Sequence, residues 1–132
     1  MPVLPSDASL IAACETAGPP HLAIVFGSVA RGTARADSDL DIAIDLGHPM
    51  PPSEKLALID ALAQASGRPV DLVDLRRAGV PLLGEILAGG RRLIGTPAAH
   101  AEWLARHATD AADFLPAYRR LIAARLDRGR AA

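Results

Sequence analysis

The chain has 132 residues, half of them apolar, and its 14 Lys and Arg residues nearly balance its 15 Asp and Glu residues. A chain of this length fits one domain, and this apolar content suffices for a core that needs no metal or disulfide to hold it. The formal net charge of -1 indicates no general affinity for polyanions, so we expect no direct nucleic-acid partner.

Cysteine content and hydropathy bear on the compartment. Cys14 is the only cysteine, which excludes an internal disulfide and fits a reducing compartment. No apolar stretch reaches membrane-spanning length, and the first residues lack the basic and then apolar pattern of a signal peptide. We therefore expect a cytoplasmic protein with no membrane partner.

The first part of the chain predicts a helix and then a strand. Ser6 is a suitable N-cap for a helix with apolar residues at helical spacing, which a glycine and two prolines end. The apolar run His21–Phe26 predicts the first strand. Gly27 and Ser28 then predict an exit turn into a short helix or loop that ends near Arg31.

The middle of the chain predicts a second strand and a longer helix. Acidic and apolar residues alternate over Leu40–Leu46, as in a half-buried strand. After a proline-rich turn, Ser53 predicts the N-cap of a helix that Gly67 ends. The residues expected on its inner face are Leu56, Ile59, Leu62 and Ala63.

A third strand is predicted over Val70–Leu75. Because side chains alternate between the faces of a strand, Asp71 and Asp74 lie on opposite faces, and only one of them can join a site with other acids. Pro81–Ala88 then predicts a short helix that two glycines end, and Arg91–Ile94 predicts a fourth strand at the edge of the sheet.

A helical tail is expected from Thr96 and Pro97 onward, although Pro116 should kink or split it. Apolar and aromatic residues recur there at helical spacing: Trp103, Leu104, His107, Ala111, Phe114, Leu115, Tyr118 and Leu121. This stripe either completes the core or forms a docking or self-association surface. The arginines near its end fit a solvated helical face better than an arm for nucleic acid.

The segment from Phe26 to Asp45 carries the chemistry. Gly27 and Ser28 follow a buried strand directly, so free backbone N–H groups can face an anion there. Asp39 and Asp41 open the next strand, where residues two apart project from the same face. Two carboxylates at one point repel each other unless cations lie between them, and the sequence therefore predicts a divalent metal site.

Each of these features has a simpler explanation when it stands alone. Gly-Ser after a strand is an ordinary turn, and a lone Asp-x-Asp is usually a solvated strand edge. Their combination and spacing favour a nucleotide and metal site. Asp45 and Asp74 lie outside the pattern, so we expect them to be surface or structural acids. The four histidines form no cluster and are expected to be solvated or satisfied.

The combined pattern resembles the nucleotidyltransferase signature of the DNA polymerase beta superfamily, and the short chain is similar to its minimal nucleotidyltransferase (MNT) branch. The positions that fill the pattern are Gly27, Ser28, Arg31, Gly32, Ser38, Asp39 and Asp41, with a third acid at Asp71. The resemblance implies an α/β (α+β) fold, with a short mixed sheet of about four strands flanked by helices. One domain would span residues 1–132, with a core at about 20–95 and a helical tail at about 97–128.

The resemblance also implies roles for these residues. Asp39, Asp41 and Asp71 would be the catalytic acids and the ligands of two magnesium ions, while ATP would be the nucleotide donor. The nucleotide would be bound by Gly27, Ser28, Arg31 and Ser38. For the last two of these, shaping the loop is the alternative role.

The acceptor follows from the same resemblance. The best understood members of the MNT branch resemble antitoxins that add AMP to a tyrosine of a partner HEPN ribonuclease. We therefore expect an antitoxin that is a protein adenylyltransferase with a HEPN toxin as its partner. Two alternatives remain open: an antitoxin that acts by binding and occlusion only, against which the intact acids argue, and a stand-alone enzyme that acts on a small hydroxyl compound.

Overall fold

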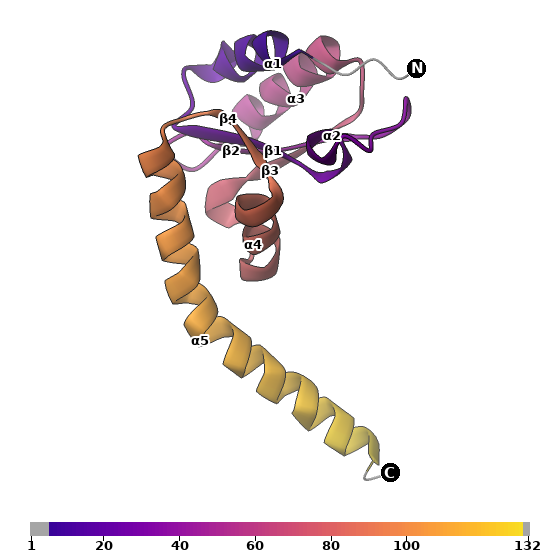
Figure 1. The fold of residues 1–132 in the computed structure, drawn as a ribbon, viewed down its shortest axis with the longest axis vertical. Coiled ribbons are helices and arrows are strands. Elements are labelled where there is room, and N and C mark those ends of the chain that lie inside the picture. Colours follow the sequence, from indigo (N-terminus) through magenta and orange to yellow (C-terminus); the bar gives the residue numbers. More distant parts are fainter. Residues whose placement is uncertain (1–5, 131–132) are drawn as a thin grey trace.

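The computed structural model describes residues 6–130 (Figure 1). The helices are α1 (Asp7–Cys14), α2 (Gly27–Arg31), α3 (Pro52–Ser66), α4 (Val80–Gly89) and α5 (Pro97–Arg130), with 3₁₀ turns η1 (Glu15–Ala17) and η2 (Leu75–Arg77). The strands are β1 (Leu22–Phe26), β2 (Leu40–Asp45), β3 (Val70–Asp74) and β4 (Arg91–Ile94). Within the described residues, no helix is both long enough and apolar enough to cross a membrane.

The strands form one mixed sheet in the order β3-β2-β1-β4. Strand β1 pairs antiparallel with both β2 and β4, whereas β2 and β3 pair in parallel. Parallel neighbours need a long crossover connection, and α3 supplies it between β2 and β3. The predicted fold class, a short mixed sheet of four strands with flanking helices and a helical tail, is confirmed.

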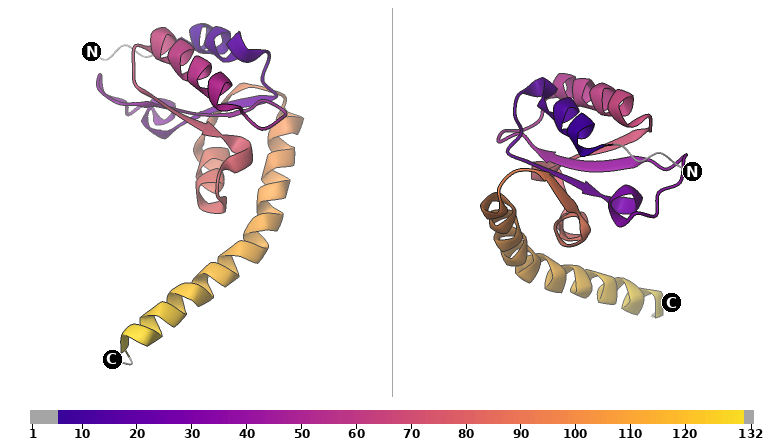
Figure 2. Two further views of the ribbon diagram at one scale, coloured as in Figure 1. Left: turned by 180° about the vertical axis from the view of Figure 1, so that it is seen from behind. Right: turned by 45° about the horizontal axis from the view of Figure 1, so that its top comes forward.

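Helices cover both faces of the sheet (Figures 1 and 2). Helices α1 and α3 lie on one face, where Leu10 and Leu58 pack against Ile42 and its neighbours. Helix α4 and the beginning of α5 lie on the other face, where Ile86 and Trp103 pack with Ile24. Because β2 alternates between these two cores, its odd-numbered residues face α4 and α5, and this orientation places the acids of β2 on that side.

Several predicted helix boundaries and faces need correction. Ser6 caps α1 as expected, since its hydroxyl oxygen accepts a hydrogen bond from the Ser9 N–H. The predicted cap at Ser53 is wrong, because α3 begins at Pro52, which needs no hydrogen-bond partner for a backbone N–H in the first turn. Leu56 was expected on the inner face but is 68% exposed, while Leu58, two positions further and so roughly opposite on the helix, is fully buried.

Pro116 was expected to kink or split the tail helix. It does not split it, because α5 is one continuous helix through Pro116, and the helix changes direction partway along its length (Figure 1). Its first turns are held by side chains: His100 Nε2 lies 3.1 Å from the Leu87 carbonyl oxygen, and His107 Nε2 lies 2.9 Å from that of Val80. These two histidines are therefore satisfied, as expected.

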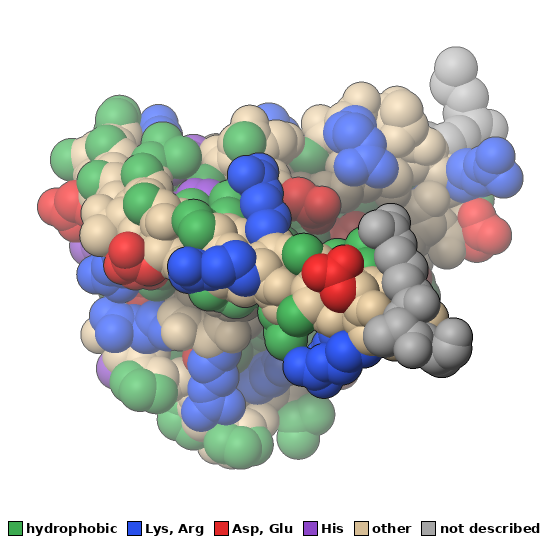
Figure 3. All heavy atoms as spheres, turned by 90° about the horizontal axis from the view of Figure 1, so that it is seen from below, with side chains coloured by type: hydrophobic (Ala, Val, Ile, Leu, Met, Phe, Trp, Pro, Cys, Tyr) green, Lys and Arg blue, Asp and Glu red, His purple; other side chains and the backbone are tan. Residues whose placement is uncertain are grey.

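The far half of α5 extends away from the sheet (Figures 1 and 2). Its large apolar side chains are exposed, namely Phe114, Leu115, Tyr118, Leu121, Ile122 and Leu126. The rings of Phe114 and Tyr118 stack at 5.8 Å. Seen from below, hydrophobic side chains and Lys or Arg side chains lie next to one another (Figure 3). Only the first part of the predicted stripe, around Trp103, therefore completes the core.

Candidate active site

The end of β1 and the start of α2 form a tight corner. Helix α2 begins at Gly27 directly after Phe26, and the φ angle of Gly27 is +71°, in the left-handed region that favours glycine. A Cβ atom at this position would collide with Oδ2 of Asp41. Glycine is therefore required twice at this corner, once for its backbone conformation and once for the close approach of an acid.

The sheet brings the three predicted acids to one place. The antiparallel register places Asp41 opposite Phe26, and the parallel register places Asp71 beside Asp41 on the neighbouring strand. Asp39 immediately precedes β2 and is exposed. Since Asp39 and Asp41 are two residues apart at the start of one strand, all three carboxylates lie at the same end of the sheet.

The electrostatics of Asp41 reflect this crowding. Partial burial raises the pKa of Asp41, and the nearby charges of Asp71 and Asp39 raise it further, whereas the Arg31 guanidinium lowers it. A carboxyl group whose neighbours disfavour its charged form is stabilised by a cation. The arrangement thus has the electrostatic character of a cation site.

The donor set fits magnesium better than a transition metal. In residues 6–130, no three His, Cys, Asp or Glu side chains are arranged to hold a metal ion among themselves. Magnesium does not need such a cage, because it is usually bound by one or two carboxylates while water and substrate phosphates complete its shell. Asp39, Asp41 and Asp71 offer only oxygen ligands, which is the chemistry that magnesium prefers.

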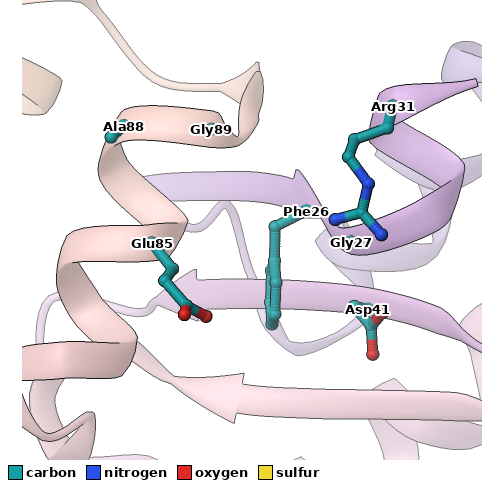
Figure 4. Close-up of a pocket in the computed structure, with 7 residues that line it drawn as sticks. All are labelled: Phe26, Gly27, Arg31, Asp41, Glu85, Ala88 and Gly89. Atoms are coloured by element: carbon teal, nitrogen blue, oxygen red, sulfur yellow. The ribbon is translucent and has the colours of Figure 1, made fainter.

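A cleft of about 590 Å³ lies beside the acids. The residues that line it are Phe26, Gly27, Arg31, Asp41, Glu85, Ala88 and Gly89 (Figure 4). Gly27, Arg31 and Asp41 were predicted from the sequence, whereas the others were missed. Glu85, Ala88 and Gly89 belong to α4, and no local pattern reveals which helix will close a cleft. The volume is typical of small-molecule sites.

The two predicted serines do not line the cleft. Ser28 is half-buried on α2 next to Gly27, and its carbonyl oxygen accepts a hydrogen bond from the Thr33 N–H at 3.0 Å. The Ser38 hydroxyl oxygen accepts a hydrogen bond from the Arg35 N–H at 2.8 Å. Ser38 therefore shapes the loop between α2 and β2, and a contact of either serine with nucleotide stays a prediction.

Arg68 holds the same loop from behind and was missed in the sequence. This residue is only 5% exposed, and its Nη1 donates hydrogen bonds to the carbonyl oxygens of Arg35 at 2.5 Å and Ser38 at 3.0 Å. Hydrogen bonds from a charged donor are the stronger kind. Arg68 thus fixes the backbone directly before Asp39.

The two acids outside the motif are structural, and the alternative that they lie on the surface is wrong. Asp45 is 2% exposed and accepts hydrogen bonds from the Gly47 N–H, Arg76 Nε and Trp103 Nε1. Burial alone would raise the pKa of Asp45, but the hydrogen bonds from Gly47 and Arg76 hold it below its usual value. Asp74 is 7% exposed and accepts from the Met50 N–H at 3.3 Å.

Solved structures share this architecture. A crystal structure of a toxin-antitoxin with AMP-PNP superposes with a TM-score of 0.80 at 28% identity, covering 92% of this chain and 98% of that chain. A tri-AMPylated Shewanella oneidensis HEPN toxin in complex with MNT antitoxin gives a TM-score of 0.73 at 26% identity over 91% of this chain and 94% of that chain. The fold is therefore shared over nearly the whole chain.

Sequence comparison agrees with the structural comparison. The protein adenylyltransferase MntA of Shewanella oneidensis is 37% identical over 76 residues, which are 58% of this chain and 55% of that relative. The match thus spans about half the length of this curated relative. The profile described as Polymerase beta, Nucleotidyltransferase matches residues 9–98, which include every acid and glycine of the site. This protein therefore belongs to the polymerase beta nucleotidyltransferase family.

Proposed function

We propose that this protein is an antitoxin that transfers AMP from ATP to a tyrosine hydroxyl of a partner HEPN ribonuclease and so neutralises it. The observation that carries the proposal is the meeting of Asp41 and Asp71 beside Gly27, at a cleft that Arg31 also lines. The relatives support the nature of the partner, because similar chains are MNT antitoxins found with HEPN toxins.

In this proposal the protein binds the triphosphate of ATP and orients its α-phosphorus. The backbone of Gly27, which lines the cleft, lies against the phosphates, Ser28 offers its hydroxyl and N–H, and Arg31 adds a positive charge. Asp39, Asp41 and Asp71 would hold two magnesium ions. When bound, these ions neutralise the charge that develops on the attacking and leaving oxygens.

The transfer makes one bond and breaks one bond. The tyrosine oxygen forms a bond to the α-phosphorus, the bond from this phosphorus to the bridging oxygen breaks, and pyrophosphate leaves. Asp71 takes the tyrosine proton. This acid suits the role because it is exposed on β3, an edge strand of the sheet, where a second protein can reach it.

The test combines the purified chain with the HEPN-type protein encoded beside it, ATP and magnesium. We expect the partner to gain the mass of one or more AMP units and to lose its ribonuclease activity. An Asp39→Asn, Asp41→Asn double variant should add no mass and leave the ribonuclease active. Asp60→Asn, an exposed acid on α3, serves as the matched control and should behave like the wild type.

The same experiment separates the alternatives. Full silencing by the double variant, without any added mass, would support an antitoxin that acts by occlusion. No added mass with the wild-type protein, together with pyrophosphate release when small hydroxyl compounds are supplied, would support the stand-alone enzyme.

A further inference from the structure

Glu85 is an acid in a cleft whose proposed ligand is a polyanion. It lies on α4, and its carboxylate points into the cleft across the Phe26 ring from Asp41 (Figure 4). Within residues 6–130, Glu85 is exposed and takes part in no ion pair. Among the described residues, neither core packing nor an ion pair accounts for the position of this carboxylate.

The chemistry of a carboxylate limits what can lie beside it. An ionised carboxylate only accepts hydrogen bonds, and it repels phosphate groups. The proposed function places the phosphates at the other end of the cleft, near Gly27 and Arg31. The part of the ligand that reaches Glu85 must therefore be uncharged or positive and must carry N–H or O–H donors.

The surroundings of Glu85 fit a nucleoside. The Phe26 ring stands between Glu85 and Asp41 and offers an aromatic surface next to the phosphate end (Figure 4). Ala88 and Gly89 line the cleft with the smallest possible side chains, and a Cβ at Gly89 would meet no atom within 4 Å. An aromatic wall, open space and one strong acceptor suit a flat base and a hydroxylated sugar.

We propose that Glu85 recognises the nucleoside of the bound nucleotide by accepting a hydrogen bond from one of its N–H or O–H donors. The inference rests on the proposed function, which fixes the end of the cleft that holds the phosphates. Two sources offer this donor in ATP: the ribose hydroxyls and the exocyclic amine of adenine. In either case Glu85 is a specificity-determining residue supplied by α4, outside the motif of β1 and β2.

The test measures nucleotide binding by calorimetry with magnesium present. ATP is compared with 2′-deoxy-ATP, 3′-deoxy-ATP and purine riboside triphosphate, which lacks the exocyclic amine. We expect wild-type protein to bind at least one analogue about tenfold more weakly than ATP, since a hydrogen bond to a charged group is lost. In Glu85→Ala, ATP should bind as weakly as that analogue, so that the discrimination disappears.

Two further variants make the result specific. Glu85→Gln keeps the size and one acceptor oxygen, so it should retain part of the discrimination. Glu102→Ala removes an exposed acid of α5 that does not line the cleft, and it should discriminate like the wild type. Circular dichroism checks that every variant is folded, and the exposure of Glu85 makes unfolding by Glu85→Ala unexpected.

The outcomes distinguish this inference from the proposed function. Unchanged ratios among the four nucleotides in Glu85→Ala would overturn the inference, even if ATP then bound more tightly because a negative charge was removed. A wild-type protein that prefers ATP through Glu85 but adds no AMP to its partner would support the inference and overturn the proposed function.

Discussion

Replacing Gly27 with alanine should nearly abolish nucleotidyl transfer while leaving the protein folded. The substitution has two separable costs. An alanine at a φ of +71° is strained by about 1–2 kcal/mol, which lowers the unfolding temperature by about 4–8 °C in a domain of this size. The new Cβ also collides with Oδ2 of Asp41 and would lie 3.0 Å from its Cγ.

The collision acts on the site more than on the fold, because the side chain of Asp41 can turn away while the backbone stays in place. A displacement of about 1 Å in a reacting group costs about a hundredfold in rate. We therefore expect at least that loss in AMP transfer, measured by mass spectrometry of the partner protein, together with weaker ATP binding by calorimetry.

Gly67 provides the matched control. It ends α3 with a φ of +66°, and a Cβ there would meet no atom within 4 Å. Gly67→Ala should lower the unfolding temperature about as much as Gly27→Ala through backbone strain alone, with little change in transfer. If Gly27→Ala bound ATP and transferred AMP like Gly67→Ala, the close approach of Gly27 to Asp41 would have no part in catalysis.

Three other substitutions test the acids and their support. Asp71→Asn should lose transfer, whereas Asp74→Asn should keep it but unfold at a lower temperature, because Asp74 accepts buried hydrogen bonds; the reverse result in the transfer assay would contradict the assignment. The pKa of Asp41 in the folded state is raised above 3.8, its ordinary value. The protonated carboxyl therefore stabilises the folded protein at pH values below the pKa of the unfolded state, and this stabilisation is lost as the pH rises through the pKa of the folded state. Asp41→Asn should therefore remove this loss and raise the unfolding temperature near neutral pH without magnesium; a fall there would show that no repulsion is relieved. Arg68→Met removes two hydrogen bonds that hold the loop before the acids, so it should lower the free energy of unfolding, measured with denaturant, by about 2–4 kcal/mol and should lower transfer. Unchanged values for both would show that the loop keeps its conformation without Arg68.

The sequence predicted the elements of the fold well, because their signals are local. The pattern of apolar and polar residues predicted the strands. Gly67 predicted the end of α3, where it adopts the left-handed backbone conformation. The start of α3 was misplaced because proline and serine both favour the first turn of a helix, and Ser53 was taken as the cap. Leu56 was placed inward because apolar residues lie on more than one side of α3, so periodicity alone did not distinguish Leu56 from the buried Leu58.

Local patterns predicted the site only where its residues are close in sequence, and Asp71 on β3 was predicted through the family resemblance. The spacing of Asp39 and Asp41 and the glycine at Gly27 are local patterns, and the structure brings two of these residues into contact. Glu85 and Arg68 reach the site through the packing of α4 and of the turn before β3, which no periodicity encodes. Contacts between residues this far apart in the sequence are identified only in the folded structure.

The two halves of α5 should differ in local stability even though they form one helix. The first half is tied to the sheet by Trp103, whose Nε1 donates to Asp45, and by the two histidines. Up to the last residue that the structure describes, the far half makes no side-chain hydrogen bond to the sheet or to α4, and it contains Pro116, which cannot donate to the carbonyl of the preceding turn. Helical order there depends on intrinsic propensity and on contacts within the helix, such as the stack of Phe114 on Tyr118, so its amide hydrogens should exchange far faster than those near Trp103. A protein that covered the exposed apolar face would slow this exchange, and part of its binding free energy would be spent on ordering the helix.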